Sequence, residues 1–372
     1  MKKEIRLFLF LSLTALLYAC TTDVELNAPY DSKTIVFGLL DPKLDTQWVK
    51  INRSWLSDGN NLDVAMIRDS SEYPDNAFQG VVNEWDNGQI SATYPLQIAE
   101  LDNKNQNGIF FGPEHKAYYF VSPGGLDDEN RYTLELDFVN EDDIYGETGV
   151  IEAAIGSITQ PPTGLNTASI NWAVNINNNI SYTNYNFRWN PSNNARRYEA
   201  NLIIHYKEYI YADQAQTILL EENVKTLNWY LGKKTVAANS PNSQITLEVN
   251  GASFFNYLAG NWEASPLIRR ELGIWDAEDQ FVRAFDFELT IADDDLNTYL
   301  NVNEPVTGVI QERPEFTNIV NGLGLFASRS TTGTYGVGYT PSTLAALVES
   351  DITAALNICT PNPFSDEYYC GE

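Results

Sequence analysis

The sequence is poor in the side chains that most often bind soft metals or act as general bases. Its 372 residues include 2 His, 3 Cys and 2 Met. Zinc, copper and haem sites are built mainly from these side chains, so we expect no such metal and no cofactor. Positive charge is also scarce, because 23 Lys and Arg stand against 50 Asp and Glu, giving a formal net charge of -27. Such a surface repels the phosphates of nucleic acids, which excludes nucleic-acid binding.

Sequence motifs of the common catalytic sites are missing. The chain has no Gly-x-Ser-x-Gly elbow, no His-Glu-x-x-His zinc motif and no Gly-x-x-x-x-Gly-Lys phosphate loop. His115 follows Gly112-Pro113, which indicates a loop, and His205 follows the apolar run Leu202–Ile204, which indicates a sheet or core position. We therefore predict no catalytic residue. Fifty acids always include some pair at glycosidase spacing, so an extracellular hydrolase acting on a glycan or peptide polymer through paired carboxylates is the alternative function.

A hydrophobic run occurs at the N-terminus, from Leu7 to Leu17, after the cations Lys2, Lys3 and Arg6. It is shorter than the roughly 20 residues that a membrane-spanning helix needs. A short apolar run behind positive charges is typical of a secretory signal. The pattern predicts a signal peptide over residues 1–19.

The signal ends in Leu17-Tyr18-Ala19-Cys20, which resembles the bacterial lipobox. That resemblance implies that Cys20 is acylated and becomes the mature N-terminus, so the chain would be held in outer-membrane lipid by its acyl chains. Asp23 and Glu25 follow closely and resemble the surface-export signal of Bacteroidota lipoproteins, which places the anchored protein on the cell exterior. The competing interpretation is an ordinary signal peptide followed by an incidental cysteine.

The other two cysteines, Cys359 and Cys370, enclose a stretch rich in turn-forming Pro and Asn residues. Such a stretch can bring its two ends together, and exported proteins fold in compartments that permit disulfides. We expect Cys359 and Cys370 to be bonded to each other.

Apolar and polar residues alternate between clusters of Gly, Pro, Asn and Asp along most of the chain, which is typical of strands. We predict a mainly β protein with two antiparallel β-sandwich domains of the immunoglobulin or fibronectin III type, a few short helices and a C-terminal helix. Pro161-Pro162 interrupts the pattern and indicates a domain boundary. The expected divisions are a signal peptide (1–19), a lipidated tether (20–29), an N-terminal sandwich (30–160), a fibronectin III-like sandwich (161–292) and a C-terminal segment with a helix and a disulfide-closed tail (293–372).

Particular elements follow from the same patterns. The passage from Tyr185 to Tyr206 resembles strands B and C of a fibronectin III domain, with Trp189 and Tyr198 as core aromatics. Helices are expected at 252–258, 263–272 and 341–356, the last with Thr340 as its cap and Pro341 in its first turn. Strands are expected at 34–39, 48–55, 81–85, 132–138, 149–158, 244–249 and 281–291.

Three features together resemble a known family: the lipobox, the segment Val36–Pro42 followed by Val49–Arg53, and the Thr-Asn-Ile-Val-Asn-Gly-Leu-Gly-Leu-Phe stretch at 317–326. The family is a group of Bacteroidota surface lipoproteins defined by a domain of unknown function. The resemblance implies an envelope role, often beside TonB-dependent outer-membrane transporters, and no catalytic residue to carry over. The expected function is a non-enzymatic binding or accessory subunit of such a transporter or of another envelope protein.

Two segments have the spacing of calcium ligands. Asn103, Asn105, Asn107 and Glu114 form one, and Asp293, Asp295 and Asn297 form the other, with Thr298 where a calcium loop has Gly. A hairpin turn and a helix cap are the competing interpretations of the two segments.

Aromatic residues are plentiful, with 8 Trp and 21 Tyr. Tyr206, Tyr209 and Tyr211 lie on or beside the end of one expected strand. They are candidates for an exposed ligand-binding face, and burial in the core is the alternative.

Overall fold

The computed structural model describes residues 32–57, 59–138, 150–155, 165, 169–176, 179–192, 194–237, 243–275, 281–304, 315–361 and 368–370. The protein is mainly β, with several sheets and few helices, which confirms the predicted fold class. The signal peptide, Cys20 and the expected boundary at Pro161-Pro162 lie outside the described residues. Within the described part of the chain, no helix is long and apolar enough to cross a membrane.

The largest element is a nine-stranded sheet in which neighbours run in the order β13-β12-β18-β20-β1-β2-β6-β5, with β15 beside β12. Its strands are β1 (Thr34–Leu40), β2 (Thr46–Arg53), β5 (Gln97–Leu101), β6 (His115–Val121), β12 (Arg197–Tyr211), β13 (Leu219–Thr235), β15 (Ile268–Leu272), β18 (Phe285–Ala292) and β20 (Leu323–Val337).

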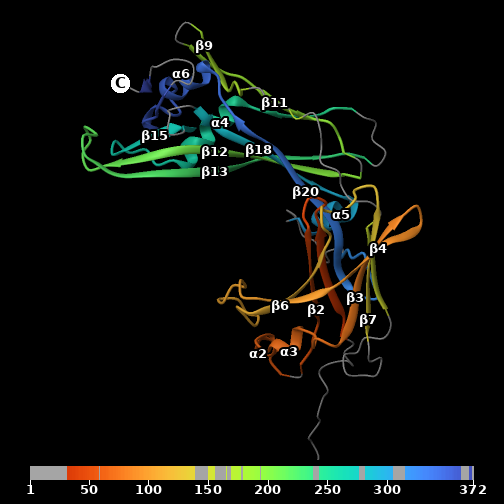
Figure 1. Cartoon of the computed structure of the whole chain (residues 1–372). Coiled ribbons are helices and arrows are strands. Elements are labelled where there is room, and N and C mark those ends of the chain that lie inside the picture. The colour runs from red at the N-terminus through yellow and green to blue at the C-terminus, as the bar shows by residue number, and fades with distance from the viewer. Residues whose placement is uncertain are drawn as a thin grey trace, which may run out of the picture.

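Strand β20 joins two bodies of the molecule. Residues 323–328 pair in parallel with β1, and residues 329–337 pair antiparallel with β18. Figure 1 shows this strand as the long blue ribbon that runs through both bodies. Gly324 lets the two parallel strands approach closely, because a Cβ there would lie 2.0 Å from the carbonyl oxygen of Val36. The parallel pairing was not part of the expected antiparallel arrangement.

The N-terminal body is a sandwich of strands β1, β2 and β6 against a five-stranded sheet. Alternate residues of the facing strands fill its core, as Val36 and Leu40 do from β1 and Leu134 and Leu136 from β7. Two short helices, α2 (Asn61–Ala65) and α3 (Arg68–Ser71), follow β2. The five-stranded sheet has the order β19 (Ile319–Val320), β8 (Val150–Ile155), β7 (Arg131–Phe138), β3 (Phe78–Asp86) and β4 (Gln89–Pro95).

The second body packs β12, β18 and the far half of β20 against a smaller layer of strands and helices. Trp189 and Tyr198 are fully buried with ring centroids 5.8 Å apart, so both predicted core aromatics are confirmed. The smaller layer contains β9 (Ala173–Ile176), β10 (Asn179–Tyr182), β11 (Tyr185–Trp189), β14 (Ile245–Val249), α4 (Gly251–Asn261) and α6 (Pro341–Glu349).

Helix α6 begins as predicted. Pro341 occupies its first turn, and the Thr340 side chain accepts a hydrogen bond from the amide of Thr343 at 3.3 Å. The helix ends at Glu349, and a short 3-10 turn, η1 (Ala354–Leu356), completes the segment that was expected to be helical throughout.

The expected helix over 263–272 is wrong. Residues Ile268–Leu272 form β15, which pairs antiparallel with β12 from Tyr206 to Ile210. Backbone pairing with an existing strand outweighed a weak local helical pattern, because tertiary contacts override propensity. Short strand pairs follow along the chain, namely β16 (Ile274–Trp275) with β17 (Phe281–Arg283) and β21 (Cys359–Pro361) with β22 (Tyr368–Cys370).

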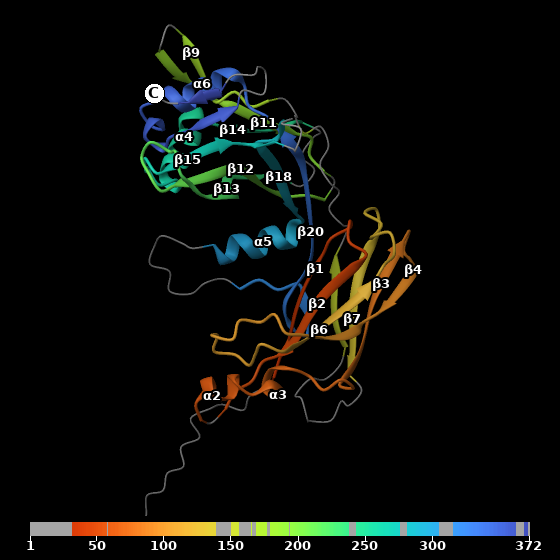
Figure 2. The same ribbon diagram turned by 60° about the vertical axis from the view of Figure 1, so that its left-hand side comes forward.

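The residues expected as a C-terminal segment are divided between the two bodies. Ile319 and Phe326 enter the core of the N-terminal body, whereas Val337, Leu344 and Leu347 enter the core of the second. Helix α5 (Asp294–Asn303) lies between them, and Figure 2 shows it beside β20 at the junction.

Candidate functional site

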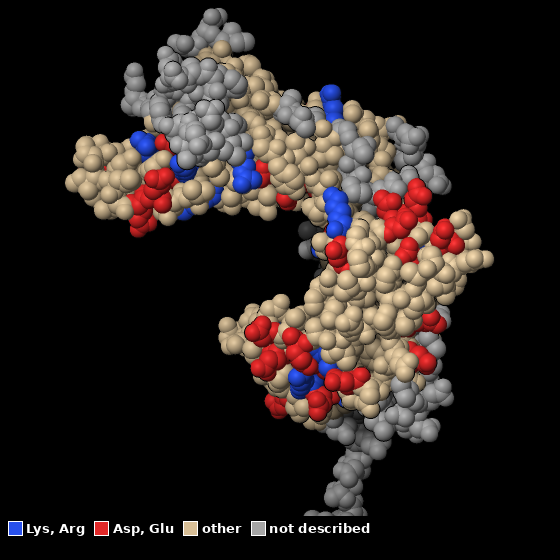
Figure 3. Space-filling view, viewed as in Figure 1, with Lys and Arg blue, Asp and Glu red and all other residues tan. Residues whose placement is uncertain are grey.

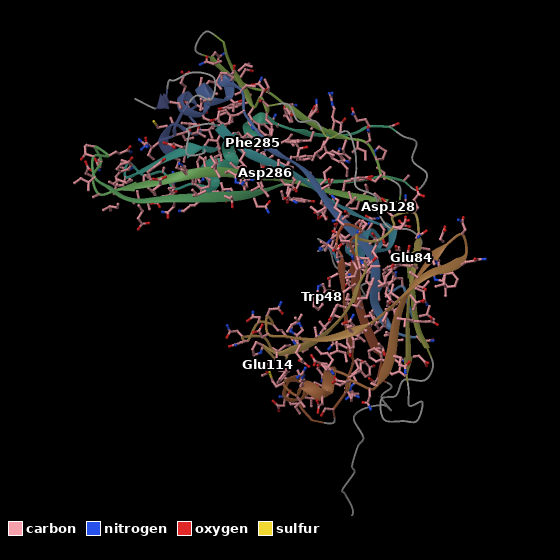
Figure 4. All side chains as sticks on the ribbon, viewed as in Figure 1. Trp48, Glu84, Glu114, Asp128, Phe285 and Asp286 are labelled. Carbon is pink, nitrogen blue, oxygen red and sulfur yellow. The ribbon has the colours of Figure 1, made fainter. Side chains whose placement is uncertain are left out.

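One face of the nine-stranded sheet packs against the two cores, and most of its other face has no second layer of described residues. We call this second face the open face. Along β1 the core side chains are Val36 and Leu40, so Phe37 and Leu39 project from the open face. Figure 3 shows the molecule hollowed between the two bodies, and Figure 4 places Trp48 on the wall of that hollow.

The open face carries eight large hydrophobic or aromatic side chains that are 36% to 60% exposed. Sheet faces of soluble proteins that meet only water are usually polar. Eight exposed apolar side chains on one sheet face therefore indicate a contact surface. The eight residues are Phe37, Leu39, Trp48, Val121, Val224, Tyr230, Leu323 and Tyr335.

Aromatic residues concentrate on the part of the open face formed by β1, β2 and β6. The rings of Trp48 and Tyr119 lie 5.2 Å apart at an angle of 40°, in neighbouring strands. The Tyr119 hydroxyl donates a hydrogen bond to Oε1 of Gln97 on β5 at 3.0 Å. This bond and the ring contact fix the two aromatic side chains on the sheet, so the surface is preformed.

Helix α5 covers the middle of the open face. Leu296 packs with Leu325 and Ala327 of β20, and the Tyr299 ring meets Phe37 edge-on at 6.1 Å. The helix therefore separates the aromatic part of the open face from the part formed by β12, β13 and β18.

The tyrosines proposed as ligand-binding aromatics lie on opposite faces of β12. Tyr206 is 5% exposed and packs on Trp262 in the core, with ring centroids 4.8 Å apart. Tyr209 and Tyr211 lie beneath the Arg269 guanidinium, 4.6 and 5.9 Å from the two ring centres, and Tyr211 is 8% exposed. Side chains in a strand alternate between faces, which separates residue 206 from 209 and 211. Tyr209, half-buried, is the most accessible of the three.

Charges on the open face are paired rather than of one sign. Lys207 meets Glu222 at 3.5 Å, and Arg269 meets Glu271 at 3.3 Å. Figure 3 shows Lys and Arg residues interspersed with Asp and Glu on the side of the second body that borders the hollow. The open face is thus less acidic than the composition of the chain would lead one to expect.

The two histidines are held by structural contacts. His205 is 7% exposed, and its Nε2 lies 2.8 Å from Oδ2 of Asp286 on β18. Asp286 also accepts a hydrogen bond from the amide of Gly336 at 3.0 Å. No hydroxyl or thiol in the described part of the chain is hydrogen-bonded to the His205 ring. His115 begins β6, with its Nδ1 3.5 Å from the carbonyl of Pro113.

A polar cavity of about 460 Å³ lies beside α3. Glu72 lies buried at the wall of this cavity. Burial by itself raises the pKa of a carboxyl group. Hydrogen bonds from Arg68 and from the Lys116 amide nevertheless hold the pKa of Glu72 below its usual range. Arg68 also meets Glu100 at 2.5 Å, and Lys116 meets Asp75 at 2.5 Å. These charges neutralise one another and tie α3 to the sheet.

The calcium candidates lie in two separate places. The Asn105 side chain accepts a hydrogen bond from the amide of Asn107 at 2.9 Å, in the loop before β6 that also contains Asn103 and Glu114. No group of three or more His, Cys, Asp or Glu side chains arranged to hold a metal occurs among the described residues.

The second candidate group is built around the start of α5. Asp293 caps the helix by accepting from the amides of Leu296 (2.8 Å) and Ser328 (2.6 Å). Asp295 accepts from the side chain of Asn318 at 2.8 Å. The Asn297 side chain accepts from Asn301 of the same helix at 3.3 Å, so each of the three candidate ligands accepts from a different donor within the protein.

The two C-terminal cysteines stand opposite each other. Cys359 and Cys370 are direct partners in the register of β21 and β22, and Cys359 is disulfide-bonded. The pairing of these two residues stays a prediction that peptide mapping can test.

Sequence reasoning missed the aromatic part of the open face. A signal for it exists in β1, where apolar residues follow one another from Ile35 to Leu40 with one Gly between them. Such a continuous run predicts a strand that contacts apolar groups on both faces. A search of protein-family models finds no match for this chain, and a search of curated proteins finds none either.

Proposed function

We propose that this protein is a lipoprotein, acylated at Cys20 and held on the exterior of a bacterial outer membrane, that binds a partner protein through its open face. It acts as a non-enzymatic accessory subunit. The partner class that the family resemblance implies is a TonB-dependent transporter or another envelope protein.

The observation that carries the binding role is the preformed aromatic part of the open face. Trp and Tyr residues contribute most to protein–protein interfaces when they are buried by a partner, and charged residues are depleted at interface centres. Phe37, Leu39 and Trp48 offer such a centre, bordered by polar side chains such as Gln97. The hollow beside them provides a concave site for a convex partner.

The alternative hydrolase requires two carboxyl groups with suitable pKa values facing one cleft. Among the described residues, the carboxyl groups whose pKa is raised are Glu271 and Asp293, both through burial. Glu271 lies on β15 and Asp293 at the start of α5, which Figure 1 shows at separate places. The arrangement therefore favours the binding role.

The anchoring part of the proposal is tested by replacing Cys20. In cells given a labelled fatty acid, the wild-type chain should carry the label and sediment with outer membranes. Cys20→Ala should carry no label and leave the membrane fraction. A variant that is still labelled and still sediments would overturn the anchor.

The binding part is tested with purified, detergent-solubilised outer membrane. The double variant Phe37→Ala, Trp48→Ala should lose the proteins that copurify with the wild type. A matched control is Ile90→Ala, Ile98→Ala, because these residues are 50% and 38% exposed and lie outside the open face. Equal capture by both double variants would overturn the open face as the binding surface.

A further inference from the structure

A second exposed apolar surface lies at the end of the N-terminal body that is distant from the second body, where Figure 1 shows α2 and α3. Its six large hydrophobic side chains are 39% to 56% exposed. We call this surface the α2 patch. It consists of Leu56, Leu62, Met66 and Ile67 around α2, and Ile109 and Phe110 in the loop between β5 and β6.

The two segments of the α2 patch are fastened together. The amide of Phe111 donates to the carbonyl of Ala65 at 2.9 Å, and the Phe110 ring meets Trp55 edge-on at 6.1 Å. The loop is closed by a hydrogen bond from the amide of Lys104 to the carbonyl of Pro113 at 3.2 Å. The patch is therefore one surface that two parts of the chain build jointly.

The chain that leads from Cys20 reaches the described structure beside this patch. The Ser32 hydroxyl donates to the carbonyl of Ser54 at 2.7 Å, and the amide of Lys33 donates to the Ser54 hydroxyl at 2.8 Å. Ser54 precedes Leu56 of the patch by two residues. Covalent geometry limits the span from Cys20 to Ser32 to roughly 40 Å.

We propose that the α2 patch rests on the lipid surface that holds the acyl anchor, so that the protein meets the membrane at two places. This inference rests on the proposed function, because it needs the acylated Cys20. A short tether gives the patch a high effective concentration at the membrane, and exposed Leu, Ile, Met and Phe side chains gain free energy by entering its interface. Other apolar surfaces, such as Ile218–Leu220 at the tip of the β12–β13 hairpin, lack this position beside the tether.

The charge of the whole chain specifies the kind of lipid surface. At the patch itself both signs occur, because Asp63 and Asp69 lie in α2 and α3, whereas Lys104 Nζ lies 5.6 Å from the centre of the Phe110 ring. Anionic headgroups would repel a chain of net charge -27, so apolar contact with uncharged headgroups supplies the attraction. Binding should therefore be stronger on neutral vesicles than on anionic ones at low salt, and added salt should reduce the difference.

The test uses residues 20–372 with Cys20→Ala, so that no acyl chain contributes, and vesicles of phosphatidylcholine. The patch variant carries Ser at Leu62, Met66, Ile67 and Ile109, which are 52% to 56% exposed. The matched control carries Ser at Ile218, Leu219, Leu220 and Val320, which are 49% to 61% exposed. Thermal unfolding verifies that all three proteins are folded.

We expect the unsubstituted protein to cosediment with the vesicles. The vesicle affinity of the patch variant should be lower by roughly tenfold or more. The affinity of the control should stay within about twofold of the unsubstituted protein. No cosedimentation of the folded parent, or an equal loss in the patch variant and the control, would overturn the proposal. Capture of an envelope protein that depends on the patch, without vesicle binding, would overturn it in favour of a protein partner. Fatty-acid labelling of wild-type Cys20 is measured separately, so failure of the anchor is distinguishable from failure of the patch.

Discussion

The two faces of the nine-stranded sheet carry apolar side chains but have different surroundings. On the covered face, Phe287 is 1% exposed and stacks on Phe187 with centroids 4.5 Å apart. On the open face, Trp48 is 44% exposed although its ring contacts Tyr119. The first arrangement stabilises the fold, whereas the second leaves apolar area exposed, which the proposed function assigns to a partner. The comparison teaches that an apolar side chain in a strand can either stabilise the fold or form a binding surface. Substitution distinguishes the two roles by its effect on stability.

The largest effect is expected on the covered face. Phe287→Ala should lower the free energy of unfolding by about 3–5 kcal/mol, because it opens a cavity among the aromatic residues of the second body. Denaturant unfolding of the purified protein measures this change. A loss under about 1 kcal/mol would show that the covered face is not closely packed.

A smaller effect is expected where the C-terminal tail closes the covered face beside β15. The Thr360 hydroxyl accepts a hydrogen bond from the amide of Leu272 at 2.9 Å, which places the tail against the core. Cys359→Ser should cost about 2–3 kcal/mol by the chain-entropy model while both bodies stay folded. Non-reducing peptide mapping of the wild type should recover Cys359 linked to Cys370, and free thiols at both positions would contradict the pairing.

The cap of α5 tests the helix that covers part of the open face. Asp293→Ala removes an acceptor for two buried amides and should cost about 1–2 kcal/mol. Burial raises the pKa of Asp293 to about 7 from an ordinary value of 3.8. The unfolded chain then releases this proton at lower pH than the folded protein does. The stabilising contribution is complete below about pH 4 and is lost as the pH rises to about 7.

The pH dependence is measured against Asp293→Asn, whose side chain does not titrate. Its single Oδ1 can accept only one of the two amide hydrogen bonds that Asp293 accepts through Oδ1 and Oδ2, so the variant is less stable throughout and only the pH dependence of the difference is read. The difference in melting temperature, wild type minus variant, should fall between pH 4.5 and 7.5 by the argument above. A difference that does not change over this range would contradict the raised pKa.

The smallest effect on stability is expected on the open face. Trp48→Ala removes the ring contact with Tyr119. Beyond that contact, the free energy of unfolding should change by less than about 0.5 kcal/mol, because the side chain is nearly half exposed. Its effect should instead be seen in partner capture. A loss as large as that of Phe287→Ala would mean that Trp48 is a core residue and that the two faces do not differ as described.

Much of the fold follows from local patterns. Alternation identified β1, β7 and β14 to within a residue or two, and the Thr340 cap with Pro341 located the start of α6. The same reasoning could not tell which of Tyr206 and Tyr209 faces the core, because alternation separates two faces without saying which one becomes covered. It also missed β15, whose strand geometry depends on β12 lying beside it.

The sequence by itself determined that the chain is mainly β, because the period of two and the turn residues act over a few neighbours. The resemblance to fibronectin III strands predicted that Trp189 and Tyr198 are core residues, and both are buried. Only the tertiary structure decided that β20 joins the two bodies by pairing with β1 on one half and β18 on the other. The pairing with β1 joins residues 288 positions apart, as Ile35 and Leu323 are, and no local pattern encodes it. The open face and the α2 patch also depend on tertiary structure. A side chain on a strand or helix is exposed or buried according to which distant segments of the chain pack against it.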